Sequence, residues 1–181
     1  MLKHLSVHAL LVLLIAVAAL PALAQKTGEK EAGTRDLAAF NLGESHLAIQ
    51  GYDPVAYFPE GGGAPKKGDE KLALEHEGVV YHFASEANRE AFKKEPEKYE
   101  PQHGGWCSYA MAKGKKVEID PNEFSIRDGR LFLLYSAKVT KWWKDDETNL
   151  IPKADTEWKK TTESPAPKGK AKAKGSGSKQ E

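Results

Sequence analysis

Cys107 is the single cysteine of this 181-residue chain. A thiol without a partner in its own chain suits three kinds of chemistry: an intermolecular disulfide, a metal site or a reactive nucleophile. The alternative is an inert buried cysteine that packs as a small hydrophobic residue. The segments around Cys107 therefore decide which chemistry to expect.

His103 lies four residues before Cys107, and two of the three residues between them are glycines. Glycine allows left-handed backbone, so the chain can fold back and bring the imidazole near the thiol. The composition of residues 106–113 predicts a helix with Cys107 in its first turn. The helix dipole and free N–H groups at that place would lower the pKa of the thiol. Thiolate and imidazole together suit a soft transition metal, with copper favoured.

Other candidate side chains come from separate segments. Asp53 precedes a proline, and this pair predicts a capped helical turn at 53–57. His82 alternates with aromatic residues in a predicted strand, which also fits a structural histidine. A metal site would require these segments to converge. The candidate ligands are Cys107, His103, His82 and Asp53, and the further candidates are Tyr57, Tyr81 and Ser85.

Residues 1–24 are typical of an export signal. Lys3 precedes the apolar run 9–20, and the sequence Ala-Leu-Ala at 22–24 resembles a signal-peptidase site. This run is shorter than the roughly 20 apolar residues that span a bilayer. We expect a periplasmic or secreted protein that begins at Gln25 and has no transmembrane span. An uncleaved anchor is the alternative.

Charge is distributed unevenly along the chain. The net charge of the whole is +1, but residues 159–181 carry +5 and residues 25–158 carry −5. Residues 161–181 contain no large apolar side chain, which predicts a disordered Lys-rich tail. Such a tail suits contact with anionic surfaces, and export makes nucleic acid a poor candidate. The alternative is a solvated tail without a partner.

Between a lead-in at 25–38 and the tail, residues 39–160 are enough for one domain. Apolar runs around Glu77-Gly78 and Asp128-Gly129 predict two β-hairpins. Several short helices accompany them, and we find no internal repeat. The pattern indicates a small single α+β domain. The predicted strands are 72–76, 79–83, 124–127 and 130–134; the predicted helices are 86–94, a segment after Ser136, and 152–159; residues 59–69 are a predicted flexible loop.

Three strings carry a resemblance to a known family. GYDPVAYF at 51–58, GVVYHFAS at 78–85 and NREAFKKEPEKYEPQHGGWCSYA at 88–110 closely resemble exported bacterial YHS-domain proteins, over residues 47–158. Tyr81, His82 and Ser85 look like the residues of the family name, although two residues separate His82 from Ser85. The resemblance implies a YHS-like α+β fold and an association with heavy metals such as copper. The exported subgroup includes selenoproteins, and the resemblance implies soft-metal or redox chemistry at Cys107.

The sequence therefore favours an exported binding module that holds copper or another soft metal through Cys107, rather than an enzyme. One alternative is a thiol redox protein that uses a low-pKa Cys107 and an external thiol partner. The other is a structural or partner-binding domain without chemistry. The sequence contains no P-loop or dinucleotide fingerprint, so we expect no nucleotide cofactor.

Overall fold

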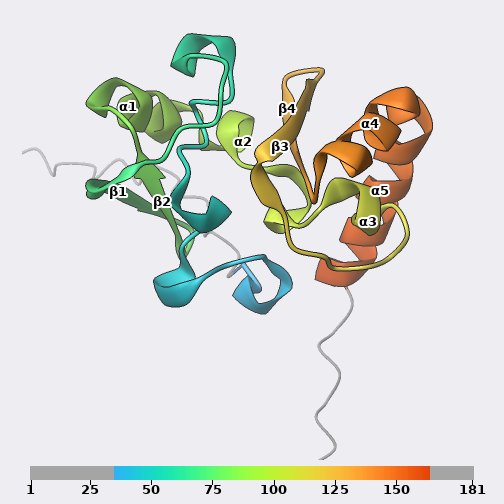
Figure 1. Ribbon diagram of the computed structural model, residues 1–181. Helices are drawn as coiled ribbons and strands as arrows, with labels where there is room; N and C mark the ends of the chain where they lie inside the picture. Colours follow the sequence, from blue (N-terminus) through green and yellow to red (C-terminus); the bar gives the residue numbers. More distant parts are fainter. Residues whose placement is uncertain (1–34, 164–181) are drawn as a thin grey trace, which may run out of the picture. The chain divides into compact units, whose positions relative to one another are not determined.

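The computed structural model describes residues 35–163 (Figure 1). These residues form a small α+β domain with two antiparallel two-stranded sheets and five α-helices, which confirms the predicted fold class. No helix in this range is long and apolar enough to cross a membrane. The predicted signal peptide at 1–24, the lead-in up to residue 34 and the tail from residue 164 lie outside the described residues.

The first hairpin pairs β1 (Asp69–His76) with β2 (Val79–Phe83). The turn between them uses positive φ angles of 48° at Glu77 and 83° at Gly78, as the Glu-Gly pair predicts. Helix α1 (Glu86–Lys94) follows, and the short α2 (Pro96–Tyr99) comes next. Strand β1 begins three residues before the predicted strand, and α1 has the predicted bounds.

The second hairpin pairs β3 (Asp120–Arg127) with β4 (Arg130–Leu134), and helices α4 (Ala137–Asp145) and α5 (Glu147–Glu163) follow. Helix α5 is much longer than the predicted segment 152–159, because the chain continues as a helix through Pro152. The predicted tail boundary is therefore wrong by three residues, since 161–163 belong to α5.

The segment between the hairpins differs from the prediction. Helix α3 covers only Ser108–Met111, whereas the composition predicted a helix over 106–113. Left-handed φ angles at residues 103–105 and the extended backbone of Trp106 delay the helix, so Cys107 is the residue immediately before it. Short 3-10 turns connect the remaining segments: η1 (Leu37–Ala39), η2 (Glu44–His46), η3 (Ile49–Gly51), η4 (Pro59–Gly61) and η5 (Gln102–Gly105).

The two hairpin units are one structure built twice. Strands β1 and β2 and helix α1 each begin and end 51 residues before β3, β4 and α4. The strand register corresponds pair by pair, and both pairs contain an irregularity directly after their first residue pair. The helix caps Ser85 and Ser136 share extended backbone, with φ of −156° and −165°. The expectation of no internal repeat is therefore wrong at the level of structure.

The segment before each hairpin is repeated as well, at a spacing of 54 residues. The φ angles of residues 49–51 are 51°, 51° and 79°, and those of residues 103–105 are 56°, 60° and 80°. Leu47 forms an isolated parallel bridge with Val80, and Pro101 forms the corresponding bridge with Leu131. We call residues 47–99 the first repeat and residues 101–150 the second repeat.

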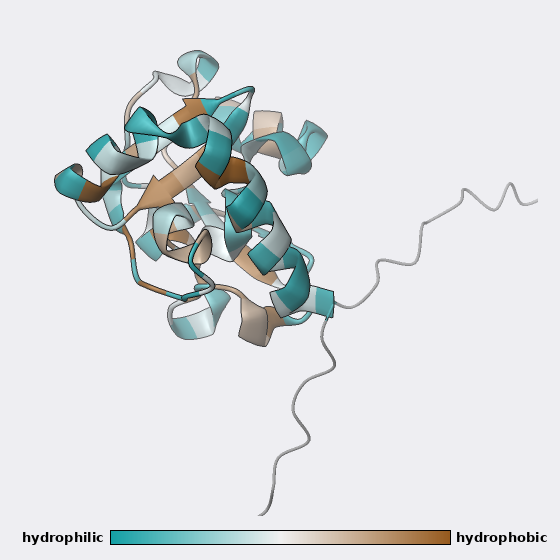
Figure 2. Cartoon of the chain, turned by 90° about the vertical axis from the view of Figure 1, so that its right-hand side faces the viewer, coloured by the Kyte–Doolittle hydropathy of each residue, from teal (hydrophilic) through white to brown (hydrophobic). Residues whose placement is uncertain are grey.

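Aromatic side chains join the repeats into one core. The Tyr57 ring of the first repeat meets the Phe124 ring of the second edge to face, with centroids 5.1 Å apart. Hydrophobic residues concentrate in the strands, whereas the outer turns of the helices are hydrophilic (Figure 2). Arg35 pairs with Glu77 and Glu100 at 2.5 Å and 2.6 Å. Residue 35 therefore packs on the domain, although the sequence placed it in the lead-in.

Candidate functional site

Cys107 lies in the core, at the residue before α3. Its side chain is 1% exposed, and its backbone N–H donates to the Val117 carbonyl at 3.0 Å. The corresponding residue of the first repeat is Asp53, whose N–H donates to the Lys66 carbonyl at 2.9 Å. The second repeat thus has a thiol at the position where the first repeat has a carboxylate.

The Asp53 carboxylate is fully buried and gathers three backbone N–H groups. Those of Val55 and Ala56 donate to Oδ1 at 2.8 Å and 3.3 Å, and that of Ala84 donates to Oδ2 at 2.8 Å. The Asn88 side chain adds a fourth donor at 2.6 Å. Because each donor lies inside the protein, Asp53 closes the turn in front of the first hairpin, and it is committed to this structural role.

Corresponding amides surround the thiol in the second repeat. Burial raises the pKa of Cys107, against a smaller lowering by the backbone N–H groups of Ala110, Tyr135 and Tyr109. The expected low pKa of Cys107 is therefore wrong: the helix start supplies amides, but exclusion of water outweighs them. The position of Asn88 is taken by Val139 in the second repeat, so the fourth donor is missing there.

His103 is the centre of a buried polar network. Its Nδ1 lies 2.9 Å from Ser108 Oγ, and its Nε2 lies 3.0 Å from Asp155 Oδ1. Arg130 makes two hydrogen bonds to the same carboxylate, at 2.6 Å and 3.1 Å. Burial lowers the pKa of His103 despite the opposing carboxylate, which favours a neutral ring that donates from Nε2 and accepts from Ser108.

These three residue types match a hydrolytic triad, but the geometry serves packing. Ser108 is 0% exposed and His103 is 2% exposed, so a substrate has no access to either. His103 also adopts left-handed backbone, and a Cβ on the neighbouring Gly104 would overlap the Trp158 ring at 2.4 Å. The network therefore fastens the turn before Cys107 to α5.

The remaining named candidates have structural partners. The Tyr57 hydroxyl donates to the Pro121 carbonyl at 2.8 Å, and the Tyr81 hydroxyl donates to Glu100 at 2.8 Å. Burial raises the pKa of both phenols. Ser85 caps α1, where its Oγ accepts from the Asn88 N–H at 3.1 Å.

The structure does not bring the predicted metal ligands together. Among residues 35–163, no group of three or more His, Cys, Asp or Glu side chains could hold a metal ion. Cys107 and His103 belong to the second repeat, where the thiol is enclosed and both His103 ring nitrogens have protein partners. Asp53 and His82 belong to the first repeat. Metal binding therefore stays a prediction. The arrangement of these four side chains does not favour it.

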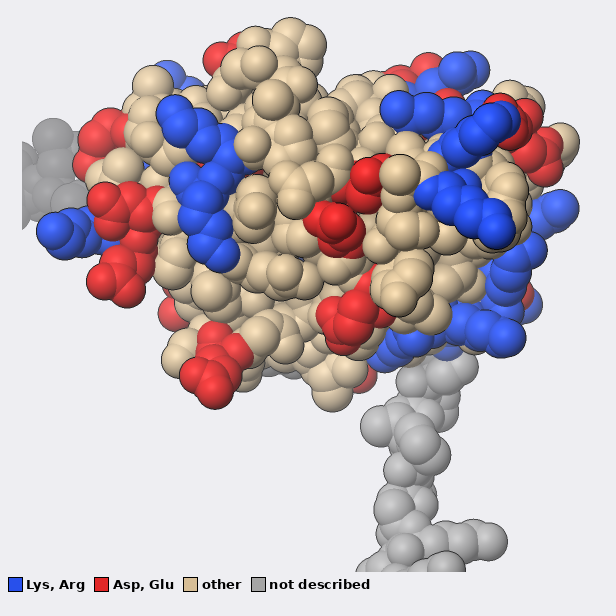
Figure 3. Space-filling view, viewed as in Figure 1, with Lys and Arg blue, Asp and Glu red and all other residues tan. Residues whose placement is uncertain are grey.

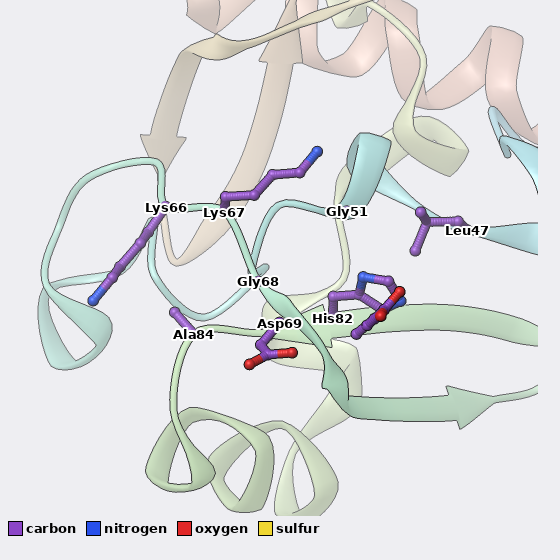
Figure 4. Close-up of a pocket in the computed structure, with 9 residues that line it drawn as sticks. Leu47, Gly51, Lys66, Lys67, Gly68, Asp69, His82 and Ala84 are labelled. Atoms are coloured by element: carbon purple, nitrogen blue, oxygen red, sulfur yellow. The ribbon is translucent and has the colours of Figure 1, made fainter.

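His82 differs from the other candidates because it faces an open cleft of about 600 Å³. The cleft lies where the start of β1, the end of β2 and the turn at Gly51 meet (Figure 4). Charged and polar side chains from residues 66–70 and from β2 line it, whereas the turn at Gly51 contributes Leu47 and Gly51. The lining residues are Leu47, Gly51, Lys66, Lys67, Gly68, Asp69, Glu70, His82 and Ala84.

Two nitrogen atoms lie beside Gly51 in this cleft. A Cβ placed on Gly51 would lie 3.5 Å from both His82 Nδ1 and Lys67 Nζ. Lys67 is held there by a hydrogen bond to the Gln50 carbonyl and by the Tyr52 ring, 5.1 Å from its nitrogen. Lys67 extends toward Gly51, whereas Lys66 points away from His82 (Figure 4). Gly51 has no side chain, so the space that its Cβ would take is bordered by these two nitrogens and by Leu47 Cδ2, also at 3.5 Å.

The second repeat has no counterpart of this cleft chemistry. Its residues at the positions of Lys67, Gly68, His82 and Ala84 are Glu118, Ile119, Leu133 and Tyr135. Leu133 is 0% exposed and Ile119 is 6% exposed, and Asn41 lies over Gly105. Glu118 and Ile119 border a smaller cleft of about 200 Å³, so the histidine and the lysine, rather than the presence of a cleft, are specific to the first repeat.

Sequence reasoning missed several residues of these sites. Asp155 lies 52 residues from His103, and no local pattern links them. Lys67 belongs to a segment whose composition indicates only a loop. The available signal for the repeat was that a glycine turn precedes each hairpin, although Gly51 lies 18 residues before β1 and Gly105 lies 15 residues before β3.

No family model, curated protein or solved structure matches the chain.

The Asp53 network predicts a large loss of stability on truncation. Asp53→Ala leaves three buried donors and the half-buried Ala84 N–H without an acceptor, and we expect it to lower the free energy of unfolding by about 3–5 kcal/mol. Asp69→Ala is the matched control, because the exposed Asp69 accepts from a single exposed amide and its loss should cost about 1 kcal/mol or less. Urea unfolding at pH 7 measures both. Equal losses in the two variants would contradict the assigned role of Asp53.

The Cys107 environment predicts a protected thiol. Because the thiol is buried and its pKa is raised, iodoacetamide should modify native protein at least about 100-fold more slowly than urea-unfolded protein at pH 8. Mass spectrometry follows the reaction. A native thiol that reacts as fast as the unfolded one, or that stays reactive below pH 7, would restore the low-pKa hypothesis.

Proposed function

We propose that this chain is an exported YHS-type binding module that holds the oxyanion of a small molecule in the cleft beside His82. One observation carries the proposal: Lys67 Nζ and His82 Nδ1 both lie beside Gly51 at the open cleft, where the second repeat has Glu118 and the buried Leu133. The proposal keeps the binding function that the sequence favours, and moves it from Cys107 to an open site.

The ligand class follows from the groups in the cleft. An ammonium group and an imidazole N–H are donors that favour carboxylate or phosphate oxygens. Asp69 and Glu70 are exposed acids that line the same cleft, and Asp69 also accepts the Lys71 N–H at 2.9 Å. The proposed anion lies on the Gly51 side of the cleft, where Lys67 and His82 are the polar groups nearest to the space above Gly51.

The family resemblance supports the same place. Gly51 begins the string GYDPVAYF, and His82 belongs to GVVYHFAS. These two strings are far apart in the sequence, and they meet at the cleft. YHS membership, export and the binding of a small ligand are together one proposal about the chain.

Copper binding through Cys107 and thiol redox chemistry stay separate hypotheses. The thiol is enclosed, and both His103 ring nitrogens have protein partners. Either chemistry would require the segment around Cys107 to open, and to break the contacts between His103 and α5.

Anion binding has a variant set taken from the second repeat. His82→Leu and Lys67→Glu introduce the residue types found at Leu133 and Glu118, so the fold accommodates them. Each should weaken the binding of inorganic phosphate about tenfold or more in a calorimetric titration at pH 7, because each removes one charge-assisted or polar donor. Lys71→Glu is the charge-matched control, since Lys71 is exposed and does not line the cleft.

The outcome that contradicts this proposal is equally plain. If Lys71→Glu weakens phosphate binding as much as Lys67→Glu does, the effect is one of net charge and the cleft has no special role. Absence of phosphate and acetate binding to the wild-type protein would also end the proposal.

The copper hypothesis is decided by a competition titration. On the geometry described, Cu(I) should bind the folded wild-type protein and Cys107→Ala with affinities that agree within about threefold, because a buried ligand with no converging partners adds little. His76→Ala is the surface control. A loss of affinity confined to Cys107→Ala would instead support the copper site.

A further inference from the structure

We propose a second binding surface: the face formed by α4 and the loop 113–116 docks on membranes with anionic lipid headgroups. This face lies in the second repeat, and the proposal is independent of the His82 cleft. It rests on exposed aromatic side chains, on lysines above their rings and on a comparison of the two repeats.

Large apolar side chains are exposed at this face. Tyr135 is 55% exposed and Trp142 is 44% exposed, and they are the exposed large hydrophobic residues of the described chain. The ring of the half-buried Tyr109 lies 5.8 Å from that of Trp142. Aromatic residues with a polar end are the side chains that favour the headgroup region of a bilayer.

Lysines cover these rings. Lys138 Nζ lies 4.9 Å from the centre of the Trp142 ring, and Lys113 Nζ lies 4.6 Å from that of Tyr109. Neither lysine forms an ion pair with any residue between 35 and 163. Lysine and arginine side chains gather over α4, α5 and this loop at the right-hand side of Figure 3. The face therefore presents free positive charge beside exposed rings.

The first repeat shows that the fold does not need these side chains. Its residues at the positions of Tyr135, Lys138 and Trp142 are all alanine, namely Ala84, Ala87 and Ala91. A serine N-cap with extended backbone and a helix of the same length form around the alanines, although Ser85 accepts a side-chain cap hydrogen bond and Ser136 does not. The hairpin and helix therefore form without these three side chains, so folding does not explain why the second repeat exposes a tyrosine, a lysine and a tryptophan.

Charge and ring chemistry select the partner. Each lysine near an anionic bilayer contributes about 1 kcal/mol, and tryptophan adds interfacial partitioning. The chain continues from α5 with a Lys-rich sequence, and residues 159–181 carry a net charge of +5. An anionic membrane surface satisfies both segments at once. Single-stranded nucleic acid also stacks on aromatic rings, and the test below includes it.

The test compares the expected mature chain, which begins at Gln25, with a triple variant of it, Tyr135→Ala, Lys138→Ala and Trp142→Ala, which copies the first repeat. The probes are two kinds of vesicle. One contains phosphatidylcholine with about 30% of the anionic lipid phosphatidylglycerol, and the other contains phosphatidylcholine alone. We expect the wild type to sediment with anionic vesicles at least about tenfold more strongly than with neutral ones, and the triple variant to lose most of this preference. Lys93→Ala on α1 removes one exposed charge elsewhere, and should retain it.

Three results would overturn the proposal: an equal anionic preference in the wild type and the triple variant, equal wild-type binding to both vesicle types, or binding to a single-stranded oligonucleotide without binding to vesicles. Circular dichroism confirms that the triple variant is folded. If it is not, the single variant Lys138→Glu replaces it, and an unchanged anionic preference in Lys138→Glu overturns the proposal in the same way.

Discussion

The structure depends on satisfying the backbone N–H groups at the turn in front of each hairpin. Buried donors without acceptors are costly, so each turn requires an acceptor at one position. In the first repeat the Asp53 carboxylate joins this turn to the end of β2 and to α1. In the second repeat Cys107 occupies the corresponding position, and the His103 network ties the turn to α5. The two repeats therefore differ in the chemistry at this position.

Local signals were sufficient for the hairpins and for α1. Glu77-Gly78 and Asp128-Gly129 specify tight turns, and Ser85 specifies a helix start, because each depends on neighbours in the sequence. The length of α5 and the late start of α3 depend on contacts between distant segments. Trp158 packing on Gly104 is one such contact, and no sequence window contains both residues. The repeat was missed because its halves share geometry and few residue types.

His82 was named from the sequence as a candidate metal ligand, and the structure places it beside an open cleft that the other named candidates do not line. Cys107 looked reactive because a helix start and a nearby histidine normally lower a thiol pKa. Burial has the larger effect here, and burial follows from the tertiary structure, which composition does not reveal. Lys67 could not be found, since its role requires the turn at Gly51 to lie beside β2.

The central claim is that the first repeat has an anion-binding cleft and the second repeat does not. Amide chemical shifts of the ¹⁵N-labelled protein, followed while inorganic phosphate is added, test it most directly because the second repeat is an internal control. The account predicts saturable shifts at Gly51, Gly68 and His82, with the corresponding Gly105, Ile119 and Leu133 unchanged. Equal shifts in both repeats, or none at the cleft, would contradict it.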